Sequence, residues 1–286
     1  MTIAGDEPSL GAPDDLSPRE REAVSALVRA MADDEFVLAE RYTEWQVRSP
    51  TLESDLALSN VAQDEYGHAR LWYDLLQDFG ASEAELIWEA DPVDFRHATL
   101  VELPFPEGDW ADPILRSYLF DVYEKLHLEA LEDSSYPRIR DRVGKVQSEE
   151  TFHREHAENW LERLCADPDG RERVQFAADR LFPYGLTLFV PTDRESAIVD
   201  LGIRTDPLDS LREDWFAEVI PFLESLGIDL PVTDDGVVEV ELPEKIGRRG
   251  DHTDHWPDLF AEFTHTYREM DLDEPPRLME DPDDVG

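Results

Sequence analysis

Apolar residues recur at helical spacing along most of the chain. A Ser-Pro pair followed by Glu20 opens the first stretch, 17–48, because serine caps a helix, proline fits its first turn and an early acid suits the helix dipole. Ser49-Pro50 interrupts the pattern, and a second stretch, 51–80, ends at a glycine that can act as a C-cap. The two stretches therefore predict a helical hairpin that turns at Pro50.

Further stretches with the same period follow a proline-rich connection. The predicted helices span 112–131, 138–164, 171–190, 208–226 and 255–270. The sequence VVEVEL at 237–242 alternates between apolar and acidic residues, as a short strand would. No glycine-rich phosphate loop or nucleophile motif interrupts this pattern. The chain is therefore expected to be all-α.

The two ends of the chain lack the helical period. Residues 1–16 are rich in glycine, proline and aspartate and are expected to form a disordered lead, and 271–286 are expected to form a disordered acidic tail. The stretch 17–270 between them is expected to fold as one helical domain, since a chain of this length can bury an ample core.

The acidic excess changes the picture of the surface. The chain carries 68 acidic and 26 basic residues, a net charge of -42. Molar salt shortens the screening length to roughly 3 Å and cancels most of the resulting self-repulsion, so a halophilic origin is expected. Nucleic acid and anionic membranes bind basic patches, so neither is an expected partner. One cysteine, no signal pattern and no run of 18 apolar residues favour a cytoplasmic protein.

Two segments share the form E-x-x-H: Glu65 with His68, and Glu150 with His153. Residues three apart lie on one face of a helix, so a carboxylate and an imidazole at this spacing can hold one metal ion. The motif alone is weak evidence, because this composition gives roughly two acidic-x-x-His matches by chance. Three further matches occur, and most of them are expected on solvated helix faces: Asp94/His97, Glu124/His127 and Glu262/His265.

The spacing of the acids around the predicted turns is more specific. Glu35 lies 15 residues before Pro50 and Glu65 lies 15 after it. An antiparallel hairpin brings both carboxylates to one height, roughly 22 Å from the turn. In the second hairpin Asp121 lies 16 residues before the proline of the turn, and Glu150 lies 13 after it. Each hairpin thus supplies one acid and one E-x-x-H, so we expect a ferritin-like four-helix bundle with additional C-terminal helices.

Four carboxylates and two imidazoles make an oxygen-rich shell. Such a shell suits a pair of iron or manganese ions better than a structural zinc ion, which prefers cysteine and histidine. The alternative is that Glu35 and Asp121 are ordinary polar residues. Asp121 is difficult to place on a surface, because Phe120 and Val122 flank it in an aromatic-rich stretch.

Longer stretches around these residues resemble the phenylacetyl-CoA epoxidase family of multicomponent di-iron monooxygenases. Four stretches resemble the catalytic subunit of that family: R-S-P-T-L (48–52), Q-D-E-Y-G-H-A (63–69), K-V-Q-S-E-E-T-F-H (145–153) and R-L-F-P-Y-G-L-T-L-F-V-P-T-D (180–193). Two other stretches resemble the smaller, non-catalytic partner subunit: A-D-D-E-F-V-L-A-E (32–40) and G-R-R-G-D-H-T-D-H (247–255). The resemblance therefore indicates the family and leaves both subunit types open.

The resemblance implies a specific site and chemistry. The metal ligands it implies are Glu35, Glu65, His68, Asp121, Glu150 and His153, of which the four carboxylates are the expected catalytic residues. It also implies two iron ions, O2 as co-substrate, and electrons from a separate NAD(P)H-dependent reductase.

The implied activity is epoxidation of the aromatic ring of phenylacetyl-CoA in aerobic phenylacetate degradation. The implied partners are other epoxidase subunits in a hetero-oligomer, the reductase and the aryl-CoA substrate. The alternatives are a non-catalytic scaffold subunit of the same complex and a ferritin-like iron-binding protein.

An aryl-CoA substrate needs basic residues near its phosphates. The candidates are Arg138, Arg140, Arg142 and Lys145, and a second group is Lys245, Arg248 and Arg249. Pairing of these residues with surface acids is the alternative. His252 and His255 have the spacing of metal ligands, although a structural or subunit-interface role is favoured. The aromatics expected either to line a dry pocket or to pack in the core are Phe36, Trp45, Trp72, Tyr73, Phe120, Tyr123 and Phe152.

Overall fold

The computed structural model describes residues 9–105, 109–233, 238–269 and 277–278. Its longer helices are α1 (Pro18–Thr43), α2 (Leu52–Gln77), α4 (Ala111–Glu129), α5 (Pro137–Cys165), α6 (Pro168–Gly185), α8 (Leu208–Ser225) and α9 (Trp256–Glu269). Two short α-helices are α3 (Thr99–Glu102) and α7 (Glu195–Asp200). The remaining helical turns are η1 (Pro13–Asp15), η2 (Ala84–Trp88), η3 (Pro92–Asp94), η4 (Leu186–Phe189) and η5 (Gly247–Arg249).

The predicted all-α class is confirmed, with one local correction. The strand expected at 237–242 is wrong for its described part, where Val238 makes only an isolated bridge with Val232. Residue 237 lies outside the described residues. The helix expected at 171–190 begins earlier, because Asp167 caps it, and its last turn tightens into η4. None of the described helices is long and apolar enough to cross a membrane.

Local chemistry sets the ends of the first two helices. Ser17 and Glu20 form a reciprocal capping box at the start of α1. The Thr51 side chain accepts from the Ser54 amide at the start of α2. The intervening turn places Val47 in the left-handed region, with φ 63°. These signals make α1 and α2 antiparallel neighbours.

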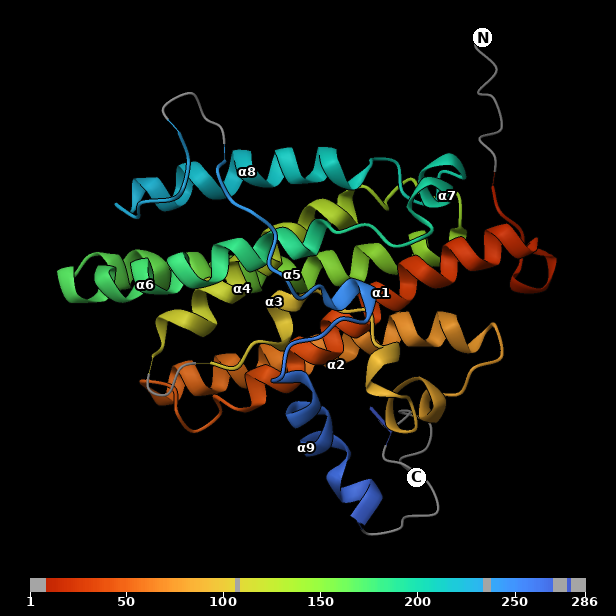
Figure 1. The fold of residues 1–286 in the computed structure, drawn as a ribbon, viewed down its shortest axis with the longest axis horizontal. Helices are drawn as coiled ribbons and strands as arrows, with labels where there is room; N and C mark the ends of the chain where they lie inside the picture. Colours follow the sequence, from red (N-terminus) through yellow and green to blue (C-terminus); the bar gives the residue numbers. More distant parts are fainter. Residues whose placement is uncertain (1–8, 106–108, 234–237, 270–276, 279–286) are drawn as a thin grey trace.

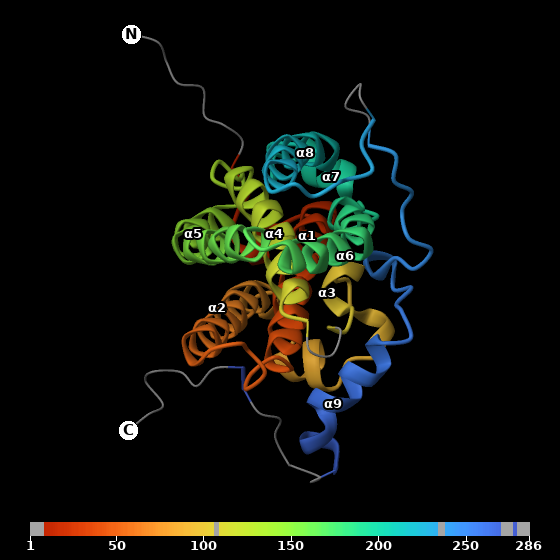
Figure 2. The same cartoon turned by 90° about the vertical axis from the view of Figure 1, so that its left-hand side faces the viewer.

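Two helical hairpins form the four-helix core. α1 packs along α2, and α4 packs along α5. In the end-on view α2 and α5 lie on the same side of this core, while α6 and α8 pack against α4 from another side (Figure 2). Because α2 also contacts α5, the two helices that carry the E-x-x-H motifs are neighbours in the bundle.

The segment that leads to α9 crosses the bundle from the side of α8 (Figure 1). Phe263 of α9 packs edge-on against Phe36 of α1, with ring centroids 5.1 Å apart. Arg248 is buried between α1 and the residues before α3, where it forms an ion pair with Asp34 and donates to the Arg96 carbonyl at 2.7 Å. The additional C-terminal helices are therefore tied to the same core.

Parts of the expected lead and tail contact the helical domain. The Leu10 amide donates to the Ser135 carbonyl at 2.8 Å, and Leu16 is buried. The Leu278 amide donates to a carboxylate oxygen of Glu83 at 3.0 Å. Residues 1–8, 270–276 and 279–286 lie outside the described residues, so the expectation of disorder there stays a prediction.

Candidate metal centre

The structure buries all the metal ligands expected from the sequence. Glu35 comes from α1, Glu65 and His68 from α2, Asp121 from α4, and Glu150 and His153 from α5, and none is more than 3% exposed. The antiparallel pairing of helices in each hairpin thus places one acid and one E-x-x-H motif from each hairpin in the same interior region.

Two glutamates lie between the two histidines. His68 Nδ1 lies 3.9 Å from Glu65 Oε2 and 3.3 Å from Glu150 Oε1. His153 Nδ1 lies 3.7 Å from Glu65 Oε1 and 3.0 Å from Glu150 Oε1. Glu35 Oε2 also lies 3.9 Å from His68 Nδ1. The carboxylates of Glu65 and Glu150 therefore lie between the two imidazoles, an arrangement that could hold metal ions.

Several donor atoms of this cluster are buried without a hydrogen bond. Among the described residues, both carboxylate oxygens of Glu65 and Glu150, and Nδ1 of His68 and His153, are buried without a hydrogen bond. Buried carboxylates are costly unless a cation or hydrogen-bond donors compensate them. An oxygen-rich set with two imidazoles fits iron or manganese, so the residues present fit a di-metal group.

A further ligand candidate, Glu124, was missed by the sequence analysis. Its carboxylate converges with His68 and Glu150, with donor atoms within 4.8 Å of one another. The expectation of a solvated face for Glu124 and His127 is wrong, since each is 4% exposed. The missed signal is spacing, because Glu124 lies 13 residues before the turn proline and Glu150 lies 13 after it.

Asp121 lies one helical turn from Glu124. The Ser117 hydroxyl donates to Asp121 Oδ2 at 2.9 Å, and Oδ1 has no partner among the described residues. Asp121 does not belong to the described groups whose donor atoms converge most closely. Its role as a ligand stays a prediction, and α4 offers two acids where one was expected.

Mutual repulsion shifts the titration of the cluster when no metal is bound. Burial, followed by repulsion from Glu124 and Glu65, raises the pKa of Glu35 well above its usual range. Burial and Glu150 raise the pKa of Glu124 and of Asp121 in the same way. A bound dication would reverse these shifts, because it favours ionised carboxylates.

Each histidine of the cluster is held by a carboxylate of the other E-x-x-H helix. His68 Nε2 lies 2.8 Å from Glu149 Oε2, and His153 Nε2 lies 3.2 Å from Asp64 Oδ2. Glu149 and Asp64 directly precede the glutamates of the two motifs, so the bracing is reciprocal. A carboxylate at Nε2 favours a proton there and leaves the Nδ1 lone pair facing the cluster.

The aromatic residues considered for a dry pocket differ in their burial. Six of the aromatics considered for a dry pocket are buried, namely Phe36, Trp45, Trp72, Tyr73, Phe120 and Tyr123. Phe152 differs, because it is 51% exposed and therefore does not line a dry interior. The cavity bordered by Glu35, Glu124 and Phe120 has a volume of about 10 Å³. A cavity of that size holds about one water molecule.

The proposed CoA-binding residues on α5 have local partners. Arg138 pairs with Asp78 at 2.6 Å, Arg140 donates to the Ser134 carbonyl at 3.2 Å, and Arg142 donates to the Leu71 carbonyl at 3.1 Å. Lys145 is exposed. These contacts agree with local pairing on the surface, and the substrate role of the four residues stays a prediction.

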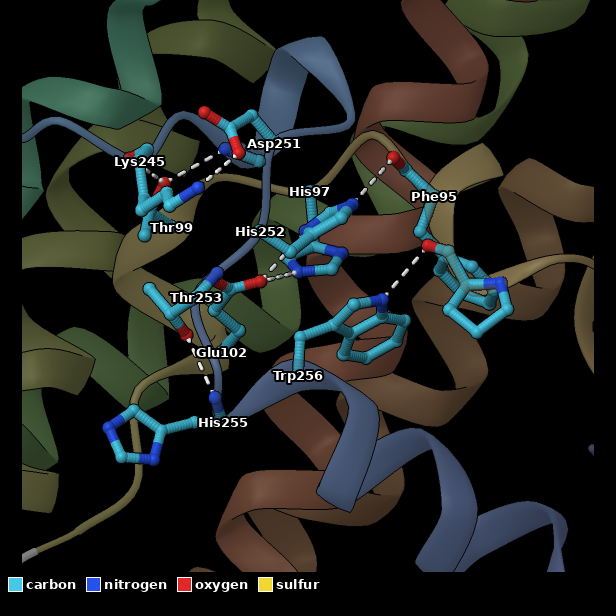
Figure 3. Close-up of polar contacts among 12 residues, drawn as sticks. Phe95, His97, Thr99, Glu102, Lys245, Asp251, His252, Thr253, His255 and Trp256 are labelled. Atoms are coloured by element: carbon cyan, nitrogen blue, oxygen red, sulfur yellow. Dashed lines mark hydrogen bonds and ion pairs between the residues drawn. The ribbon is translucent and has the colours of Figure 1, made fainter.

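The two histidines near the C-terminus differ in their surroundings. His255 is exposed, whereas His252 Nδ1 lies 2.8 Å from Glu102 Oε2 (Figure 3). His97 Nε2 lies 2.6 Å from the same oxygen, and the Thr253 amide donates to Oε1 at 2.7 Å. The expectation of a solvated face for His97 is wrong, since it is fully buried.

The His97–Glu102–His252 cluster differs chemically from the metal centre. Its facing donor atoms are joined by hydrogen bonds, whereas those of the metal centre have none. Burial lowers the pKa of His97 to about 4, which keeps its imidazole neutral. This arrangement supports the favoured structural role of His252, because it fastens the segment before α9 to the segment around α3.

Comparison with known proteins gives concordant matches. A family model described as phenylacetic acid catabolic protein matches residues 8–273. The chain is 29% identical to the C component of the 1,2-phenylacetyl-CoA epoxidase of Escherichia coli K12 over 248 residues, which cover 86% of this chain and 96% of the relative. It is 24% identical to the A component of the same enzyme over 195 residues, covering 66% of this chain and 62% of that relative.

Proposed function

Because the chain belongs to the phenylacetic acid catabolic protein family, we propose that it is a subunit of a multicomponent di-iron monooxygenase that epoxidises the aromatic ring of phenylacetyl-CoA. Its partners would be further epoxidase subunits and a separate NAD(P)H-dependent reductase. The observation that carries the metal assignment is the convergence of buried, unpartnered carboxylate and imidazole atoms from α1, α2, α4 and α5.

Several residues of the centre would hold the two irons. Glu65, Glu150, His68 and His153 would hold the ions, because their facing donor atoms lie within 3.0–3.9 Å of one another. Glu35 would be a further ligand, because its Oε2 lies 3.9 Å from His68 Nδ1. The iron pair, when bound, supplies the activation of O2 for oxygen transfer to the ring.

The protein groups around the shell orient and protect it. Glu149 and Asp64 fix the orientation and tautomer of the two imidazoles. Phe120, which is buried and borders the small cavity with Glu35 and Glu124, would keep bulk water from the ligands. Asp121 and Glu124 supply negative charge from α4 that would help neutralise the ions.

A second candidate is a scaffold subunit that holds metal without turning over substrate. The observation that favours it is the cavity of about 10 Å³ beside Glu35 and Glu124. An aromatic ring is far larger than one water molecule, so substrate access would require α4 to move or a partner protein to open the bundle.

Metal analysis tests the di-iron centre. Protein purified in high KCl is reconstituted with ferrous iron and air, and iron per chain and near-UV absorbance are measured. Close to two irons per chain, lost in Glu150→Ala and retained in Glu262→Ala, supports the centre. Glu262 is the matched control, because it belongs to an exposed acidic-x-x-His segment on α9. Folded protein without iron would overturn the assignment.

A turnover assay separates the catalytic role from the scaffold role. The chain is combined with its partner subunits, the reductase and phenylacetyl-CoA, and epoxide formation is followed. Under the first candidate, Glu150→Ala abolishes turnover while the complex still assembles. Unchanged turnover in a complex that contains the metal-free variant would assign the chain to the scaffold role.

A further inference from the structure

A surface pocket of about 790 Å³ lies beside the N-terminal half of α1, and none of the metal ligands lines it. Its walls come from α1, from the end of α2 and the residues leading to η2, from the segment before α7 and from η5, all of which can be located in Figure 1. The pocket therefore joins segments that are distant in the sequence.

The charge of this pocket is opposite to that of the chain. Over the whole chain 26 basic residues face 68 acidic ones, yet six arginines and three acids line the pocket. The arginines are Arg21, Arg29, Arg96, Arg194, Arg248 and Arg249. A basic pocket of this kind attracts anions locally, whereas the acidic surface elsewhere on the protein repels them.

Carboxylates compensate part of this charge. Asp33 accepts from Arg29 Nε at 2.7 Å, and Arg248 is paired with the buried Asp34. Glu22, one of the three lining acids, pairs with Arg194 at 2.9 Å. These pairs hold three of the guanidinium groups in place at the pocket wall.

The other three arginines have no carboxylate partner in the described part of the chain. Arg21 donates to the Pro13 carbonyl at 3.2 Å, and Arg96 donates to the carbonyls of Val93 and Phe95. The exposed Arg249 side chain has no hydrogen bond or ion pair there. Carbonyl groups leave the positive charge uncompensated, so these guanidinium groups remain available to an anion, with only Asp94 and Asp193 opposing them.

Arg29 adds unused hydrogen-bonding capacity. Its Nη2 is buried and has no acceptor among the described residues, although its Nε is paired with Asp33. A buried donor of this kind is costly unless it finds an acceptor, and an anion in the pocket would supply one.

We propose that this pocket binds a phosphate-bearing organic ligand of the nucleotide diphosphate class. A guanidinium group can donate two parallel hydrogen bonds to two oxygens of one phosphate, which favours phosphates over single-charge anions. Leu76, Phe79 and Leu86 provide an apolar wall for the remainder of the ligand. The volume falls within the range of about 300–1,000 Å³ that is usual for small-molecule sites.

The pocket is separate from the metal centre, although the two lie along the same helix. Arg29 and Glu35 lie six residues apart on α1, about 9 Å along the helix axis. A nucleotide with a long arm, such as the pantetheine arm of CoA, could hold its phosphates at the arginines while the arm extends away from them. The nucleotide can be free or the head of an acyl-CoA, and the choice of probes below distinguishes the two.

Calorimetric titration in KCl tests the proposal, with ADP, CoA and inorganic pyrophosphate as probes and adenosine as the neutral control. Arg249→Ala removes an unpaired guanidinium and leaves the fold intact. It should weaken diphosphate binding about ten-fold or more, as expected for a charge-assisted contact. Arg163→Ala is the matched control, because Arg163 is exposed and lies on α5 in another pocket. Arg29→Lys, which removes the unpartnered Nη2, is the second test variant.

Each probe gives a distinct outcome. Equal affinity for ADP and CoA supports the proposal and identifies the nucleotide head as the determinant, whereas tighter binding of CoA adds a contribution from its 3′-phosphate and pantetheine arm. Binding of pyrophosphate but of neither ADP nor CoA overturns the proposal, because the pocket then holds only an inorganic anion. No saturable binding by folded wild-type protein, or equal weakening by Arg249→Ala and Arg163→Ala, would overturn the proposal. The same titration with Glu150→Ala separates this result from the metal assignment, because that variant lacks a metal ligand and keeps the pocket.

Discussion

Metal-free protein should lose stability as the pH rises from about 5.5 to about 7.5. Burial and mutual repulsion raise the pKa of Glu35, Glu124 and Asp121 well above their usual range. Such groups stay protonated in the folded chain and ionise in the unfolded one. The folded state then binds more protons, so the free energy of unfolding falls with rising pH.

The two histidines of the centre act in the same direction. Although burial opposes ionisation, contact with Glu150 raises the pKa of both His68 and His153. Their stabilisation is complete below the unfolded pKa and is lost as the pH rises through the folded pKa. The pKa of Glu150 is lowered by the two histidines despite its burial, so its effect falls below pH 4 and outside this window.

The size of the change in the free energy of unfolding with pH follows from the linkage between proton binding and folding. Each group that is protonated in the folded chain and ionised in the unfolded chain contributes about 1.4 kcal/mol per pH unit. Glu124→Gln removes one such group and should flatten the slope by up to that amount, or about 2.7 kcal/mol over two units. Urea unfolding of chelator-treated protein at fixed KCl measures it. Glu262→Gln, an exposed change of equal charge, should keep the wild-type slope.

A wild-type slope in Glu124→Gln would refute the reasoning, since Glu124 would then be ionised in the metal-free fold. Iron provides an independent check. Metal binding requires deprotonated ligands, so iron affinity should rise over the same pH range in which metal-free stability falls.

Other contacts lead to four further predictions. Replacing both bracing acids, Asp64→Ala with Glu149→Ala, should lower iron affinity about 10–100-fold in a competitive chelator titration. Arg248→Ala leaves Asp34 buried without its ion pair and should lower the free energy of unfolding by about 3–5 kcal/mol in urea. Val47→Gly should raise it by about 1 kcal/mol, because Val47 is 91% exposed and holds a left-handed backbone. The melting temperature should rise with KCl, because salt screens the net charge of -42.

Each of these has a contradicting result. Undiminished iron affinity in the double variant would mean that the histidines need no brace, and Glu155→Ala, an exposed change on α5, is its control. An Arg248→Ala variant as stable as the wild type would show that water reaches Asp34. A destabilised Val47→Gly would mean that its side chain contributes packing. A melting temperature independent of KCl would argue against the halophilic interpretation.

The sequence by itself determined the helical hairpins and most of the candidate centre. Capping at Ser17 and Thr51, with prolines at both turns, sets the start of each helix and the antiparallel pairing. Once the pairing is known, a rise of 1.5 Å per residue fixes which carboxylates reach the same height. Glu35 and Glu65 meet for this reason, and their meeting needed no tertiary information.

Only the tertiary structure decided which faces turn inward. The helical period groups Glu124 with His127 on one face, yet it cannot say whether that face meets water or the opposite hairpin. His97 was likewise ambiguous, because its partners Glu102 and His252 are joined to it only when the C-terminal segment folds back. Burial of a polar face depends on what packs against it, and the packing partners of these residues lie elsewhere in the sequence.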